Sequence, residues 1–300
     1  MMKGRIASML RKVFALTLCV GAIPFLFNAH VYAGEEAELP ATEEIASTGK
    51  TRQWLDDYHK PIGLTYNAQA KIQTTYLWRG MYCGSANIQA SANVGYGGLY
   101  LDMWWNIGVE DWTFKDFEPE LDLSLGFSRW GLDVYLLYVH NFDCGFFDFN
   151  NYPDKGNRLE VNVKYIVSSK LPLGIHWGTR VSAADGYVNS AGDTVRAWSS
   201  YAEIFYTQKL PYGLSLYGEI GMTPWKSRYT RFEGNCALTN ITLRLRKDWS
   251  VTEHCGLMLM GQLTINPYLA ATDKSSVEWH SFEPFNQSVN VNVGLGVYLK

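Results

Sequence analysis

The chain has 300 residues, a net charge of −3 and 47% hydrophobic residues, with 15% aromatic residues and 27 glycines. This near-neutral balance gives no basic surface for nucleic acid, so a nucleic-acid-binding protein is not expected. Beyond the first 40 or so residues, no apolar window reaches the length of about 18 residues that a transmembrane helix needs. The aromatic content suits rings gathered at a membrane interface.

The N-terminal part has the pattern of an export signal. Basic residues precede an apolar stretch at residues 13–29, and small residues end the segment near Ala33, which predicts a cleaved signal peptide over residues 1–33. Residues 34–63 are acidic and lack periodicity, so we expect a periplasmic N-terminal segment without chemistry of its own. The remaining residues, 64–300, form one domain in this interpretation.

The strands begin after Gly63. In the first predicted strand, residues 65–80, apolar residues such as Ile72 alternate with polar ones such as Lys71. Because side chains alternate across a strand, this pattern gives one apolar and one polar face. Eleven more segments are comparable, which makes about twelve in all: 86–96, 99–109, 121–128, 132–142, 159–165, 173–183, 195–209, 213–223, 240–246, 256–266 and 287–300.

Short and long connections alternate between these strands. Tight turns at Gly97-Gly98, Trp130-Gly131 and residues 210–213 contrast with long loops such as 143–157 and 268–286. This alternation is typical of an all-β, antiparallel, up-and-down transmembrane β-barrel. A soluble sandwich or barrel has the same pattern inverted in space. Two features favour the membrane: a polar face rich in Gly, Ser and Asn, and aromatic residues at strand ends, namely Tyr76, Trp78, Trp130, Trp177, Trp198, Tyr206, Trp225 and Trp249.

If the apolar face meets lipid, the charged residues of the other face lie inside the barrel. The predicted pore-lining residues are Lys71, Arg79, Asp102, Asp122, Glu160, Lys164, Arg180, Glu203, Glu219, Arg244 and Arg246, with Asp133 and His176 as further candidates. They form either a charged constriction that selects solutes or a network of ion pairs that fills the interior. Arg244 and Arg246 are two residues apart on one strand, so they predict a basic ladder.

The sequence does not predict an enzyme, a metal site or a cofactor. The candidate bases His140, His176, His254 and His280 do not stand in a Gly-x-Ser-x-Gly setting, and no His, Cys and carboxylate spacing matches a metal site.

Export permits disulfides. Cys83, Cys144 and Cys236 fall in or near long loops and allow three alternative pairs, whereas Cys255 lies in a turn at the other end and is expected to be unpaired. The aromatic-rich loop 143–157 either binds a partner or folds into the barrel mouth.

One short motif points to a family. Residues 75–80 read Thr-Tyr-Leu-Trp-Arg-Gly, and a glycine-rich strand and residues 98–104, Gly-Leu-Tyr-Leu-Asp-Met-Trp, follow. Over residues 65–140 the chain resembles the TorF-type porin family of Gram-negative outer membranes, and this resemblance implies an outer-membrane barrel with channel function. The chain departs from the usual proteobacterial ending, because its last residue is Lys300 and its final aromatic residue is Tyr298.

We therefore predict a porin-like barrel in the bacterial outer membrane, surrounded by lipid, for passive diffusion of small hydrophilic solutes. The alternative is a closed structural or surface-recognition barrel, and a lipid-modifying enzyme is a more distant one. The sequence does not indicate the solute, an open or plugged interior, or the oligomeric state.

Overall fold

The structure is a computed structural model. It describes residues 63–109, 119–140, 142, 144–149, 157–167, 171–182, 185–271 and 288–299. The predicted signal peptide, and the N-terminal segment up to residue 62, lie outside the described residues.

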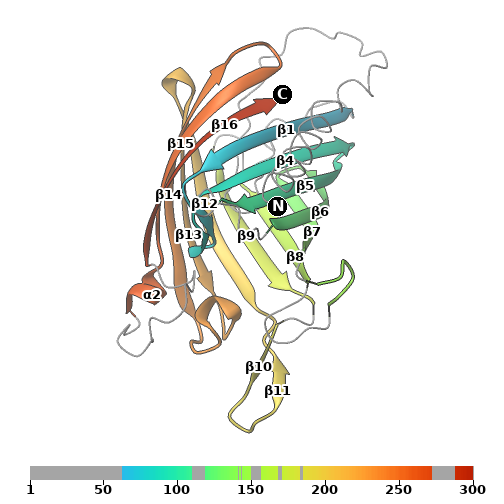
Figure 1. Ribbon diagram of the computed structural model, residues 1–300, viewed down its shortest axis with the longest axis vertical. Helices are drawn as coiled ribbons and strands as arrows, with labels where there is room; N and C mark the ends of the chain where they lie inside the picture. The colour runs from blue at the N-terminus through green and yellow to red at the C-terminus, as the bar shows by residue number, and fades with distance from the viewer. Residues whose placement is uncertain are drawn as a thin grey trace, which may run out of the picture. The chain divides into compact units, whose positions relative to one another are not determined.

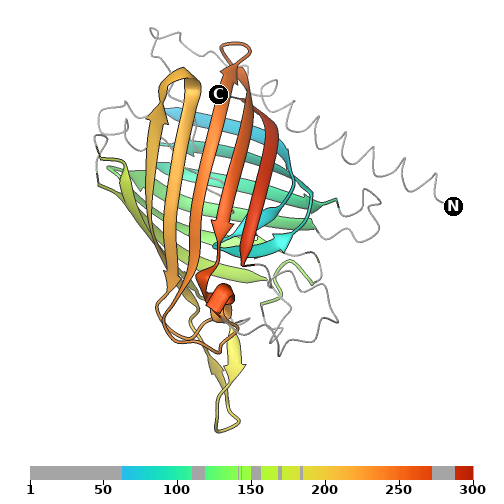
Figure 2. The same ribbon diagram turned by 90° about the vertical axis from the view of Figure 1, so that its left-hand side faces the viewer.

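Twelve antiparallel strands close into one barrel, which confirms the predicted fold class (Figures 1 and 2). Around the barrel the strands follow the order β1-β16-β15-β14-β13-β12-β9-β8-β7-β6-β5-β4, and β4 pairs with β1 to complete the ring. Their bounds are β1 Leu64–Gln73, β4 Asn87–Tyr96, β5 Leu99–Gly108, β6 Pro119–Arg129, β7 Leu132–His140, β8 Arg158–Ile166, β9 Leu173–Arg180, β12 Ser200–Leu210, β13 Leu214–Thr223, β14 Ala237–Ser250, β15 Cys255–Ile265 and β16 Val289–Leu299.

The last strand, β16, shows how the sequence alternation becomes an inside and an outside. Val289 and Val291 are 57% and 64% exposed on the outer surface, whereas the intervening Asn290 and the next residue, Asn292, are 3% and 2% exposed. The same alternation runs through the other barrel strands. An apolar exterior around a polar interior is the arrangement of a transmembrane barrel of the outer-membrane type.

The two ends of the barrel differ in their connections. One end, the turn end, carries the short β4–β5, β6–β7, β8–β9, β12–β13 and β14–β15 connections. The other, the loop end, carries the longer ones. At the loop end the hairpin of β10 (Gly186–Val188) and β11 (Thr194–Arg196) projects beyond the barrel (Figure 1). Among the described residues, no helix has the length and apolar character needed to cross a bilayer.

The short helical pieces lie in the connections. They are η2 (Pro211–Gly213) in the β12–β13 turn, η3 (Arg228–Thr230) between β13 and β14, and α2 (Pro267–Ala271) after β15. The predicted strand over residues 195–209 is wrong at its start, because β11 belongs to the projecting hairpin and β12 begins at Ser200.

The first predicted strand needs the largest correction. β1 leaves the barrel wall after Gln73, and the chain then forms a separate two-stranded sheet of β2 (Tyr76–Trp78) and β3 (Met81–Gly84). We call residues 76–84 the inner hairpin. Its turn consists of Arg79 and Gly80, which both have positive φ angles of 50° and 81°, as a two-residue hairpin turn requires.

Two predicted interfacial aromatic residues move with the inner hairpin. Tyr76 and Trp78 are buried inside the barrel, so their assignment to the lipid-facing strand ends is wrong. The other six aromatic residues of that prediction are exposed on the outside: Trp130, Trp177, Trp198, Tyr206, Trp225 and Trp249.

Candidate functional site inside the barrel

The inner hairpin crosses the barrel interior from one wall to the opposite one. It emerges from β1 and returns to β4, which are neighbours in the ring, and β9 is the seventh strand of that ring counted from β1. The hairpin tip contacts the two strands that flank β9, because Arg79 bonds to Glu160 on β8 and stacks on Tyr201 of β12. The hairpin therefore spans the interior near the loop end.

Arg79 holds the tip by a bidentate ion pair. Its Nη1 donates to Oε2 of Glu160 at 2.8 Å and its Nη2 to Oε1 at 2.5 Å. Nη2 also donates to Oδ1 of Asn162 at 3.2 Å, and Nη1 donates to the hydroxyl of Tyr229. Both members of the ion pair are buried. Because a buried charge is unfavourable without a partner, these contacts make the inward position of the hairpin strongly dependent on Glu160.

Aromatic rings surround this ion pair. The rings of Tyr76 and Trp104 lie 5.5 Å apart, those of Trp78 and Tyr229 5.6 Å, and those of Tyr201 and Tyr229 5.6 Å. The guanidinium of Arg79 lies 4.7 Å from the ring centres of both Trp78 and Tyr201. Cation–π contacts of this kind become stronger where water is excluded, so the cluster stabilises the charged tip as well as burying apolar area.

Gly80 lets the tip touch the barrel wall. A Cβ atom at this position would overlap the carbonyl oxygen of Thr239 at the start of β14. Nδ2 of Asn266, just after β15, donates to the carbonyl oxygen of Gly80 at 3.2 Å. The close approach and the positive φ angle both require glycine here.

A second charged cluster lies on β9, β12, β13 and β14. Nδ1 of His176 is 3.2 Å from Oε1 of Glu203, and Nδ2 of Asn240 donates to Oε1 of Glu219 at 2.5 Å. Nε of Arg244 donates to Oε1 of Gln262 at 3.0 Å, while Arg246 pairs with Asp248 at 2.9 Å. The two arginines share the interior face, but they bind different partners.

The opposite part of the wall is rich in amides. The interior positions of β1, β4, β5 and β16 carry the buried side chains Gln73, Asn87, Gln89, Asn93, Asn106, Asn290 and Asn292, together with Lys71 and Asp102. The interior thus has a mainly charged half on β8, β9 and β12–β14 and a half dominated by uncharged hydrogen-bonding groups.

The predicted pore-lining residues are all buried inside the barrel, as are Asp133 and His176. Ten of them are on the wall, whereas Arg79 comes from the inner hairpin rather than from a wall strand. Arg79, Glu160 and Arg180 lie together at the hairpin tip, because Glu160 and Arg180 are register partners on β8 and β9. Lys71 and Asp102 lie on β1 and β5, away from that group around the ring.

Sequence reasoning missed several partners of these residues. Tyr229 and Asn162 bind Arg79, Asp248 binds Arg246, and Glu120 binds Arg158 at 3.2 Å. One signal in the sequence could have revealed the hairpin itself: Arg79-Gly80 has the same residue-glycine form as the turn Trp130-Gly131.

Of the candidate histidines, His280 lies outside the described residues, and His140 and His176 make polar contacts with amide and carboxylate side chains. Nδ1 of His140 and Sγ of Cys144 both contact Oδ1 of Asn157, at 2.6 and 3.5 Å. The same amide oxygen therefore binds both the imidazole and the thiol. His176 contacts Glu203 and Asn162. Among the described residues, no group of three His, Cys, Asp or Glu side chains could hold a metal ion.

The cysteines and the aromatic loop differ from the expectations in position. Cys83 lies on the inner hairpin rather than in an outward loop, and within the described parts of the chain the cysteines form no disulfide. Of the aromatic loop, residues 144–149 and 157 are described. Phe146 packs against His140, with ring centres 5.3 Å apart, and Phe147 is exposed.

Similar proteins are found among solved structures. No protein-family model matches the sequence, and no curated protein matches it. Among solved structures, the NanC porin is similar with a TM-score of 0.43 and 13% identity, covering 79% of this chain and all (100%) of that one. An outer membrane channel from Pseudomonas putida F1 has a TM-score of 0.41 and 12% identity, covering 81% and 97%. Outer membrane phospholipase A from Escherichia coli has a TM-score of 0.36 and 14% identity, covering 78% and 92%. Similarity at this level does not indicate a function.

Proposed function

We propose that this chain is a porin-like channel of the bacterial outer membrane through which small hydrophilic solutes diffuse passively. The observation that carries the proposal is the interior wall: charged residues of both signs and amides follow one another along the strands of a barrel with an apolar exterior. Charges inside a membrane protein are unfavourable unless they are paired or serve a solute path. The TorF-type resemblance supports the same proposal and stays a prediction.

The two halves of the wall fit small polar solutes. The amide-rich half on β1, β4 and β16 offers donors and acceptors without net charge, which suits the hydroxyl groups of sugars. The charged half offers cations at Lys164, Arg244 and Arg246 and anions at Glu203 and Glu219. A solute that passes between these walls can exchange its hydration shell for protein groups, as selective pores require.

Solute flux into liposomes that carry the refolded protein tests this function. We expect flux of ions and small sugars, and a changed rate in the Arg244→Ala, Arg246→Ala double variant, because it removes two charges from the wall. The Arg129→Ala variant is the matched control, since Arg129 stacks on Trp130 at the turn end. A correctly folded barrel without any flux would refute the channel.

A second candidate function is a closed barrel that serves structure or surface recognition. The inner hairpin favours it, because the hairpin and its aromatic cluster occupy the interior near the loop end. The same flux experiment separates the two functions: a closed barrel shows no flux even when Arg79→Ala releases the tip from Glu160, while a channel narrowed by the hairpin shows a higher flux in that variant.

A further inference from the structure

The side chain of Arg180 is buried inside the barrel, and one nitrogen of its guanidinium group lacks a hydrogen-bond partner within the described part of the chain. It is 1% exposed, and its Nη1 is buried without a hydrogen-bond partner among the described residues. Its guanidinium lies 5.7 Å from the ring centre of Trp78 and 5.9 Å from that of Tyr229. A buried guanidinium is expected to have an anionic partner, because burial removes the water that would otherwise solvate it.

Glu160 and Glu120, two carboxylates near Arg180, bind other arginines. Both oxygens of Glu160, its register partner, accept hydrogen bonds from Arg79. Glu120 binds Arg158 at 3.2 Å and accepts a hydrogen bond from the hydroxyl group of Tyr76 at 2.6 Å. Asp185, which follows β9, accepts a hydrogen bond from the backbone N–H of Ser199 at 2.6 Å through Oδ2, while its Oδ1 has no hydrogen-bond partner among the described residues and none of its hydrogen bonds is to Arg180.

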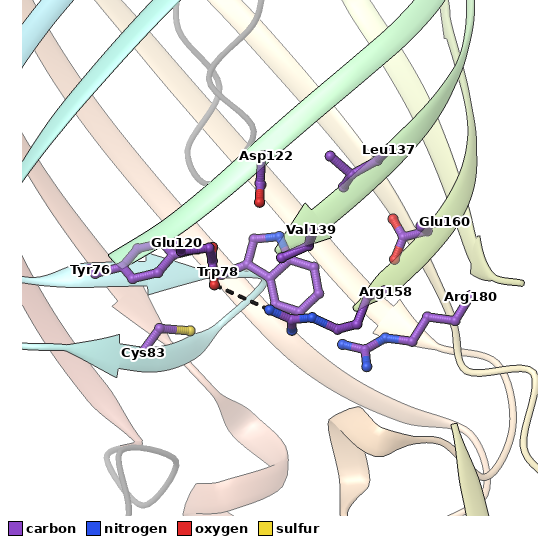
Figure 3. A pocket seen from close by; sticks show the side chains of 10 residues that line it. All are labelled: Tyr76, Trp78, Cys83, Glu120, Asp122, Leu137, Val139, Arg158, Glu160 and Arg180. Carbon is purple, nitrogen blue, oxygen red and sulfur yellow. Dashed lines mark hydrogen bonds and ion pairs between the residues drawn. The ribbon is translucent and has the colours of Figure 1, made fainter. Parts of the chain in front are cut away.

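Arg180 borders a cavity of about 40 Å³ next to the inner hairpin, shown in Figure 3. The guanidinium groups of Arg158 and Arg180 both lie near the ring of Trp78, 5.9 and 5.7 Å from its centre, and Asp122 lies above that ring in the view of Figure 3. Leu137 and Val139 add apolar lining. The volume has room for a few water molecules, or for a small anionic group in their place.

We propose that this cavity is a binding subsite for the anionic group, a carboxylate or a phosphate, of a small solute. Arg180 donates the charge-assisted hydrogen bonds, Arg158 adds positive potential, and the Trp78 ring covers the apolar part of the solute. Guanidinium groups suit planar oxyanions because their N–H groups form a fixed fork. This proposal names the class of solute that the interior selects. Its role in transport rests on the proposed channel function.

Calorimetric titration of the refolded protein in detergent tests the subsite without requiring transport. The probes are gluconate and inorganic phosphate, with glucose as the neutral counterpart of gluconate. We expect at least one anion to bind, no binding of glucose, and a loss of affinity of about tenfold or more in Arg180→Gln, as the loss of a charge-assisted hydrogen bond predicts. Binding of gluconate alone identifies a carboxylate subsite, and binding of phosphate alone a phosphate subsite. The matched control Arg129→Gln removes an equal charge outside the barrel and should bind like the wild type.

Urea denaturation measures the stability of the protein and so gives an independent readout. It can be applied even to a variant that binds no anion. Without anions, Arg180→Gln should unfold at a higher urea concentration than the wild type, because the buried unpaired charge is gone. An anion at ten times its dissociation constant should raise the folded-to-unfolded ratio of the wild type about elevenfold and leave Arg180→Gln unchanged. If Arg180→Gln fails to fold, Arg180→Met replaces it in both measurements.

The outcomes separate this subsite from the channel function. Flux without any anion binding, or anion binding that Arg180→Gln retains, overturns the subsite and leaves the channel. Anion binding that depends on Arg180 in a barrel without flux overturns the channel and supports the subsite as part of a closed, solute-binding barrel.

Discussion

The ion pair between Arg79 and Glu160 offers the sharpest test of how the inner hairpin is held. In the Arg79→Ala variant, Glu160 keeps its buried position on β8 but loses the only bidentate partner that the described residues provide. Removing one member of a buried ion pair typically destabilises a protein by about 3–5 kcal/mol. The bond from Arg79 to Asn162 and the cation–π contacts are lost as well. We therefore expect a loss of unfolding free energy of about this size.

A double-mutant cycle separates the pair from the rest of the cluster. Arg79→Met and Glu160→Gln each leave an unpaired charge, whereas the double variant leaves neither. The double variant should therefore be more stable than the sum of the two single effects predicts, by about 2 kcal/mol or more. The assay is urea unfolding of the protein in lipid vesicles, followed by tryptophan fluorescence, with Arg129→Ala as a control outside the interior.

Two results would refute this reasoning. Additive effects within about 0.5 kcal/mol would mean that Arg79 and Glu160 do not interact in the folded protein. A loss of stability in Arg79→Ala without any change in channel conductance would mean that the tip does not limit the passage, because releasing it from β8 should widen the interior.

Two further substitutions test the hairpin turn and the outer surface. Gly80→Ala should destabilise the protein by at least about 1–2 kcal/mol through the positive φ angle at this position alone. The added Cβ atom also overlaps Thr239, so it should displace the hairpin tip. The control Gly84→Ala, whose added Cβ atom has its nearest neighbouring atom at 3.9 Å, should behave as wild type in urea unfolding and in conductance. Leu295→Arg, on the exterior in the middle of β16, should cost about 2–4 kcal/mol in vesicle-based unfolding, while Val289→Arg at the strand end should cost about 0–1 kcal/mol. Equal costs at the two positions would contradict a bilayer around the barrel.

The sequence by itself determined where the barrel strands lie and which side chains of each strand point into the barrel. A period of two in hydrophobicity is a local property, so β16 and eleven other strands could be located without tertiary information. The turns Gly97-Gly98 and Trp130-Gly131 were equally local, because a two-residue hairpin turn needs positive φ angles that glycine adopts without strain. The burial of the ten predicted interior residues on wall strands follows from the same alternation, whereas that of Arg79 depends on the inner hairpin.

Only the tertiary structure decided which interior residues meet. Tyr76 and Trp78 continue the alternation of β1, so the local pattern is the same whether they face lipid or fold into the barrel. Their inward position depends on Glu160, which is 81 residues from Arg79 in the chain, and on Tyr229, which is 150 residues away. Such partners are brought together by closure of the ring between β1 and β4 and by the size of the barrel interior. The residues next to the hairpin predict neither the closure nor the size. The buried guanidinium of Arg180 likewise became visible only in the assembled barrel, where Glu160 binds Arg79 and Glu120 binds Arg158, because the balance of charges in a buried site depends on which strands come together.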